Sequence, residues 1–112
     1  MKLPKQFKLF GTTVTVEFDN KECNDIGRYG AYAYAQSKIT LSRTQQLLTL
    51  CEDRIKDTFY HEKVHAILEM MRKDDLDNNE NFVDTFAKLL RQSDESSEWA
   101  DIETFPGYEK IL

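Results

Sequence analysis

The feature that most constrains the fold of this chain is a long amphipathic pattern over residues 52–72. Its apolar side chains recur at steps of three and four, which predicts an α-helix of about five turns with one buried face. A polar loop of Asp and Asn residues follows, and a second apolar pattern predicts another helix from Glu80 to about Gln92. The positions that define the two faces are Ile55, Phe59, Val64, Ile67, Leu68 and Met71, then Phe82, Val83, Phe86, Leu89 and Leu90.

Short β-type segments precede the helices. Residues 12–18 alternate between apolar and polar side chains, as a half-buried strand does, and residues 7–10 form a second β-type run before Gly11. Residues 30–35 and 38–42 predict two more strands joined by a hairpin, residues 19–21 predict a turn, and residues 43–51 fit no single element. We therefore expect an α+β domain over residues 1–93, with a three- to four-stranded mixed or antiparallel sheet packed on the two helices.

Composition narrows the class of protein. A chain of 112 residues is the length of one domain, and its 40% hydrophobic content is that of a soluble globular protein. The net charge of −5 argues against a nucleic-acid partner, and no apolar run approaches the roughly 18 residues of a membrane span. Cys23 and Cys51 show no paired spacing, and the N-terminus lacks a secretory signal, so a reduced cytoplasmic protein is expected.

The last segment, residues 94–112, is acidic and carries Trp99, Ile102 and Phe105 at steps of three. The preferred interpretation is a short helical turn packed on the domain. An acidic tail that binds a partner is the alternative.

The chemistry of the chain is concentrated in His61-Glu62-Lys63-Val64-His65, an H-E-x-x-H pattern inside the first predicted helix. Residues four apart lie on one helix face, so both imidazoles can reach one zinc ion. Glu62 lies beside that face, where it can accept the proton of a zinc-activated water as general base. Two exposed histidines without a metal are the alternative.

Because the chain has two histidines, a third protein ligand has to come from another residue type. An antiparallel second helix would bring Glu80 back to the first helix, so Glu80 is the preferred third ligand. The alternative is that Glu80 only interacts with the dipole at the N-terminus of its own helix. Asp84, one turn further, could accept the second N–H of a ligand histidine. The rivals are the two cysteines and the loop carboxylates, whose usual role is that of solvated capping residues: Asp74, Asp75 and Asp77.

His61-Glu62-Lys63-Val64-His65 followed by Asn79-Glu80-Asn81-Phe82-Val83-Asp84 resembles the gluzincin signature, H-E-x-x-H then N-E-x-x-x-D. The continuation Asp84-Thr85-Phe86-Ala87 is similar to a helix of ImmA/IrrE-type metallopeptidases, and the whole chain resembles small phage and prophage proteins of minimal zincin type. The resemblance implies a small zincin-like domain in which His61, His65 and Glu80 bind Zn²⁺, Glu62 is the general base and Asp84 supports a ligand histidine. Two departures are Val64, where ImmA/IrrE proteins usually have Gly, and the short chain.

A zincin takes an extended peptide on a sheet edge beside the metal. The expected edge is the last strand before the motif helix: Lys38, Ile39, Thr40, Leu41 and Ser42. The expected function is zinc-dependent hydrolysis of peptide bonds in a protein substrate, within a bacterial host cell or as a phage-encoded intracellular protein. The alternative is an inactive zincin-like binding or regulatory module. The sequence does not indicate the cleavage specificity, the oligomeric state or which of the five tyrosines stabilises an oxyanion.

Overall fold

A four-stranded mixed sheet and two long helices make up the body of the protein. The computed structural model describes residues 2–109. Strands β1 (Gln6–Leu9), β2 (Thr12–Phe18), β4 (Lys38–Leu41) and β3 (Gly30–Ala33) lie side by side in that order. Strand β2 pairs antiparallel with β1 and parallel with β4, and β3 pairs antiparallel with β4. The α+β prediction and the expected strand count are confirmed.

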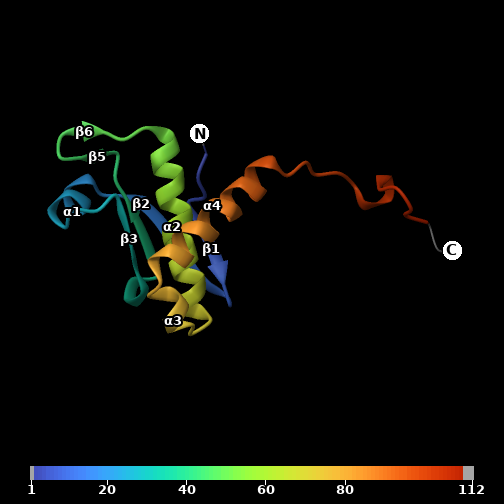
Figure 1. The fold of residues 1–112 in the computed structure, drawn as a ribbon, viewed down its shortest axis with the longest axis horizontal. Coiled ribbons are helices and arrows are strands. Elements are labelled where there is room, and N and C mark those ends of the chain that lie inside the picture. The colour runs from blue at the N-terminus through green and yellow to red at the C-terminus, as the bar shows by residue number, and fades with distance from the viewer. Residues whose placement is uncertain (1, 110–112) are drawn as a thin grey trace.

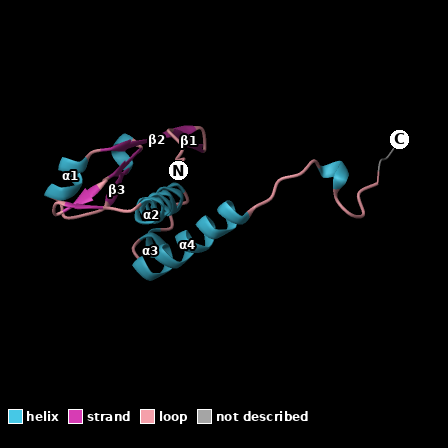
Figure 2. Ribbon diagram, turned by 90° about the horizontal axis from the view of Figure 1, so that it is seen from above, coloured by secondary structure: helices cyan, strands magenta, loops and turns pink. Residues whose placement is uncertain are grey.

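The helices stack on the sheet in layers (Figures 1 and 2). Helix α2 (Glu52–Met70) packs on the sheet, and α4 (Glu80–Ser96) packs on α2 from the other side. The short α3 (Asp74–Asp77) connects them. Both long helices predicted from periodicity are therefore confirmed, and α4 extends one turn beyond the predicted end at about Gln92.

Two clusters of buried side chains hold the layers together. Phe59 of α2 packs with Val14, Ile39 and Leu41 of the sheet, all at most 1% exposed. On the opposite side of α2, the second cluster joins α2 to α4: Val64, Leu68, Val83 and Ala87. Helix α2 is thus buried on two sides and is the central element of the fold.

The connection between β2 and β4 differs from the prediction. Residues 19–21 do not form a simple turn: Asp19 accepts a hydrogen bond from the Glu22 amide at 2.9 Å and caps α1 (Asn20–Asp25). The chain then forms β3 and turns through η1 (Tyr34–Gln36) into β4, so the predicted hairpin is confirmed. Residues 43–51, whose sequence fits no single element, form a small hairpin of β5 (Thr44–Gln45) and β6 (Leu48–Thr49).

This connection corrects the expected substrate edge. Strand β4, which contains Lys38, Ile39, Thr40 and Leu41, lies between β2 and β3, and Ser42 directly after it is buried. A central strand has both of its hydrogen-bonding edges occupied, so it cannot accept a peptide. The free edge on this side of the sheet is β3, because the hairpin inserts β4 between β2 and β3.

The residues after α4 form a C-terminal arm (residues 97–109) that extends away from the body (Figure 1). The expected helical turn is present as η2 (Ile102–Thr104), but Trp99 is 91% exposed and Ile102 is 64% exposed. The expectation that this segment packs on the domain is therefore wrong. The hydroxyls of Ser96 and Ser97 donate to carbonyls one turn earlier, at the point where α4 ends and the arm begins. Within residues 2–109, no helix combines the length and the hydropathy that a membrane crossing requires.

Candidate metal centre

Helix α2 presents both histidines of the motif on one face. The carboxylates of Glu52 and Asp53 in its first turn interact favourably with the helix dipole. Its apolar side chains are buried on either side of the motif face. The imidazole rings of His61 and His65 are one turn apart, with their centroids at 4.9 Å. This arrangement follows from the four-residue spacing alone.

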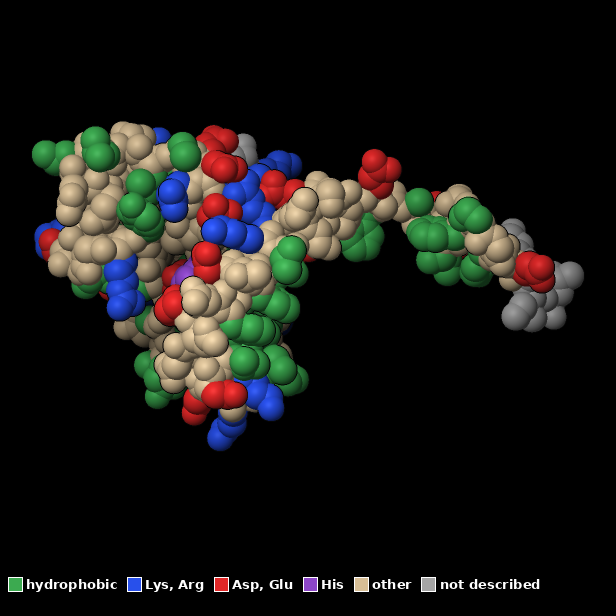
Figure 3. All heavy atoms as spheres, in the orientation of Figure 1, with side chains coloured by type: hydrophobic (Ala, Val, Ile, Leu, Met, Phe, Trp, Pro, Cys, Tyr) green, Lys and Arg blue, Asp and Glu red, His purple; other side chains and the backbone are tan. Residues whose placement is uncertain are grey.

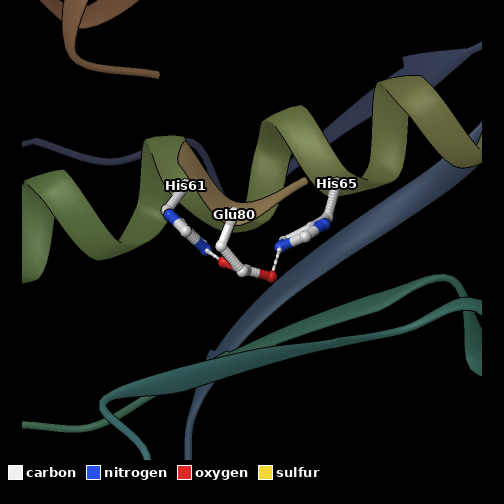
Figure 4. A group of neighbouring side chains, drawn as sticks. All are labelled: His61, His65 and Glu80. Carbon is white, nitrogen blue, oxygen red and sulfur yellow. Dashed lines mark ion pairs between the residues drawn. The ribbon is translucent and has the colours of Figure 1, made fainter. Parts of the chain in front are cut away.

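Helix α4 brings the third side chain. The Asn79 side chain accepts a hydrogen bond from the Phe82 amide at 3.1 Å and starts the helix, so Glu80 is its first residue. Because Val83 and Ala87 bury α4 against α2, Glu80 points back at the motif face. Figure 4 shows its carboxylate between the two rings, with Oε2 at 3.1 Å from His61 Nε2 and Oε1 at 3.4 Å from His65 Nε2.

The three side chains fit a divalent metal ion. One ligand atom from each of His61, His65 and Glu80 can be chosen so that all lie within 4.8 Å of one another. Tetrahedral zinc bonds of about 2.0–2.1 Å separate neighbouring ligand atoms by about 3.3 Å, which small side-chain rotations can reach from here. Two imidazoles and one carboxylate are a donor set found in catalytic zinc sites, and the group could hold a metal ion.

The outer nitrogen atoms of the two rings face carboxylates. His65 Nδ1 lies 2.6 Å from Asp77 Oδ1, a hydrogen-bond distance. His61 Nδ1 lies 3.8 Å from Asp84 Oδ1, which is longer than a hydrogen bond, and the other Asp84 oxygen accepts from Lys88 at 3.0 Å. The carboxylate that orients a ligand histidine is therefore chiefly Asp77, whereas the sequence favoured Asp84.

The sequence does not single out Asp77, because it lies in an acidic loop where capping is the usual role. The signal that could have found it is its position three residues before Glu80. Helix α3 turns that stretch back over α2, so that the last α3 residue and the first α4 residue meet the same imidazole.

The side chain of Glu62 is 9% exposed and lies beside the two histidines on the pocket wall. Burial raises the pKa of the Glu62 carboxyl, and its electrostatic interactions with His61 and His65 oppose that shift. A carboxylate that holds a proton more firmly than usual is a better general base near neutral pH.

A pocket of about 660 Å³ opens onto this group. One wall is the motif face of α2, and the other contains Gly30 of the edge strand β3. A Cβ atom at Gly30 would lie 2.9 Å from the Thr40 carbonyl oxygen and 2.7 Å from Thr58 Cγ2, so glycine allows β3 to approach α2 closely. Among the tyrosines, which the sequence did not separate, Tyr29 lines the pocket. In Figure 3 a small area of histidine surface is visible between acidic side chains.

The structure thus brings His61, Glu62, His65 and Glu80 together and leaves Asp84 at the margin. The candidate ligand group contains no cysteine: Cys23 is buried in α1, and Cys51 is exposed before α2. Comparisons with protein-family models, with curated proteins and with solved structures found no match to this chain.

Proposed function

We propose that this chain is a zinc-dependent metallopeptidase that hydrolyses peptide bonds of a protein substrate, with Glu62 as general base. The observation that carries the proposal is the convergence of His61 Nε2 and His65 Nε2 on the Glu80 carboxylate at the wall of an open pocket. Structural zinc sites use four protein ligands, whereas catalytic sites use three and keep one position for the reaction. Three candidate ligands facing a pocket match the catalytic type.

Zinc at this position would supply Lewis acidity, which polarises a carbonyl group and lowers the pKa of water toward about 7. Glu62 is placed to take the proton of the attacking water and to return it to the leaving amine. Asp77 accepts from His65 Nδ1, which fixes the tautomer that turns Nε2 toward the centre. An extended peptide can add to the free edge of β3, whose first residue lines the pocket.

The test is a comparison of purified wild-type protein with Glu62→Gln. Metal content is measured by mass spectrometry, and cleavage is measured on a mixture of synthetic peptides whose products are sequenced. We expect the variant to retain zinc and to lose about 10²- to 10⁴-fold in cleavage rate, because it keeps the three ligands but has no base. Glu98→Gln, in the exposed arm, is the matched control and should cleave at the wild-type rate.

Wild-type protein that binds no zinc, or Glu62→Gln protein that cleaves at the wild-type rate, would contradict the proposal. Wild-type protein that binds zinc and cleaves none of the peptides would favour the alternative, an inactive binding module on the same scaffold.

A further inference from the structure

Two arginines stand at one end of the pocket. Arg28 lies two residues before β3, and Arg54 lies on the first turn of α2, with its guanidinium 5.5 Å from the centre of the Tyr29 ring. Arg28, Tyr29 and Arg54 all line the pocket that contains the histidines. We call these three residues the arginine rim.

The arginine rim is the part of the pocket whose basic side chains form no ion pair, although Arg28 lies near enough to Glu62 to favour its charged form. Asp57 on the pocket wall pairs with Arg91 at 2.7 Å, and Asp84 pairs with Lys88 at 3.0 Å. By contrast, Arg28 and Arg54 form no ion pair with any carboxylate in residues 2–109. The chain has a net charge of −5, but two guanidinium groups without an ion pair line this pocket. This part of the pocket therefore favours binding of an anion.

The distance between the arginine rim and the metal ligands sets where that anion would lie. Arg54 and His61 are seven residues apart on one helix, so they are separated by about 10 Å along its axis. An extended peptide advances about 3.3 Å per residue, and the same span corresponds to about three residues.

The direction of β3 sets the side of the cleaved bond. Gly30, at the start of β3, packs beside Thr58, and the Tyr32 hydroxyl reaches Glu69 at 3.4 Å, so β3 and α2 run the same way. The arginine rim therefore lies at the beginning of β3. A peptide that pairs antiparallel with this edge has its C-terminal part at that end.

We propose that the arginine rim is a carboxylate-binding subsite that selects substrates with an acidic side chain or a free C-terminal carboxylate about three residues to the C-terminal side of the cleaved bond. This inference rests on the metallopeptidase function proposed above. The two sources of the anion share one chemistry, a carboxylate held by two guanidinium groups, and the experiment separates them.

The first measurement is binding, which does not depend on turnover. In the first comparison, a fluorescent peptide with an amidated C-terminus carries Glu at the position expected to meet the arginine rim, and its counterpart carries Gln there. In the second comparison, a neutral peptide with a free C-terminus is compared with the same peptide amidated at its C-terminus. Each is titrated by fluorescence anisotropy against Glu62→Gln protein, both zinc-loaded and metal-free, because the metal-free form excludes direct coordination of the carboxylate to zinc. We expect one acidic member to bind about five- to tenfold more tightly than its neutral partner, and the difference to shrink as salt is raised.

Arg28→Gln and Arg54→Gln should each reduce this preference, and the double variant should abolish it. Arg43→Gln is the matched control, because Arg43 is exposed and lies outside the pocket. Equal binding of acidic and neutral peptides to Glu62→Gln protein, or an unchanged preference in the double variant, would overturn the subsite.

The second measurement is the position of cleavage in the peptide mixture. With wild-type protein we expect carboxylates to be enriched on the C-terminal side of the cleaved bonds, and we expect this enrichment to disappear in the double arginine variant. Cleavage without charge preference would refute the subsite and leave the peptidase function standing. Charge-selective binding without any cleavage would refute the peptidase function and leave the subsite standing. Enrichment on the N-terminal side would overturn the proposed peptide direction.

Discussion

Removing the carboxylate of Asp77 should weaken zinc binding more than removing that of Asp84. Asp77 Oδ1 lies 2.6 Å from His65 Nδ1, whereas Asp84 Oδ1 lies 3.8 Å from His61 Nδ1. A carboxylate that accepts the outer N–H of a ligand histidine fixes the ring and makes the other nitrogen a stronger donor.

The magnitude follows from the geometry. Loss of such a partner typically costs about 10- to 100-fold in metal affinity, or about 1.4–2.8 kcal/mol. The side chain of Asp77 is 25% exposed, so we expect Asp77→Ala to lie near the lower end, at about tenfold. Asp84 is 53% exposed and shares its charge with Lys88, so its contact should contribute at most about 1 kcal/mol, or about fivefold.

The assay is competition for zinc against a chromophoric chelator, at one neutral pH and one ionic strength. Circular dichroism spectra of Asp77→Ala and Asp84→Ala should match the wild type, so that a loss of affinity reports the site and not the fold. Asp77→Asn keeps an acceptor oxygen without the charge and should fall between the wild type and Asp77→Ala. Equal losses for the two alanine variants, or a larger loss for Asp84→Ala, would show that the 2.6 Å contact does not orient the ligand.

Three further predictions concern stability. Removing zinc with a chelator should lower the Tm measured by calorimetry, and His65→Ala should mimic that loss, because metal binding favours the folded state; an unchanged melting curve would contradict a metal contribution. Burial and the hydrogen bond to Asp94 raise the pKa of Tyr60 to about 12, whereas an unfolded tyrosine titrates near about 10. The free energy of unfolding should therefore fall between about pH 10 and pH 12, where the unfolded state binds fewer protons, and less steeply in Tyr60→Phe; identical pH profiles would refute this. Replacing exposed apolar side chains of the arm by Ala should leave Tm unchanged, and a lowered Tm would show that the arm packs on the body; the triple variant changes Trp99, Ile102 and Phe105.

Local patterns predicted the helical part of this protein well. The apolar period of α2 and the polar loop after it depend on neighbours within a few turns, and such spacing survives any tertiary arrangement. The same holds for His61 and His65, whose common face is a property of one helix. Glu80 needed one further assumption, that α4 returns antiparallel to α2 after a short connection, and the structure brings its carboxylate to both rings.

Strand order could not be predicted in this way. The alternation in residues 38–42 indicates a strand, but it does not specify whether that strand is central or at an edge. The outcome depends on β2 pairing with β4 across the intervening α1 and β3, a contact between segments far apart in the chain. The free edge beside the pocket consequently belongs to β3.

The sequence by itself determined that one helix carries two imidazoles at a spacing suited to one metal ion, with the Glu62 carboxylate beside them. The tertiary structure decided that Asp77 lies within hydrogen-bond distance of His65 and that Arg28 and Arg54 line the same pocket. Helical spacing is fixed by bonds and hydrogen bonds within a few residues, whereas these pairings depend on how α3, α4 and β3 pack around α2.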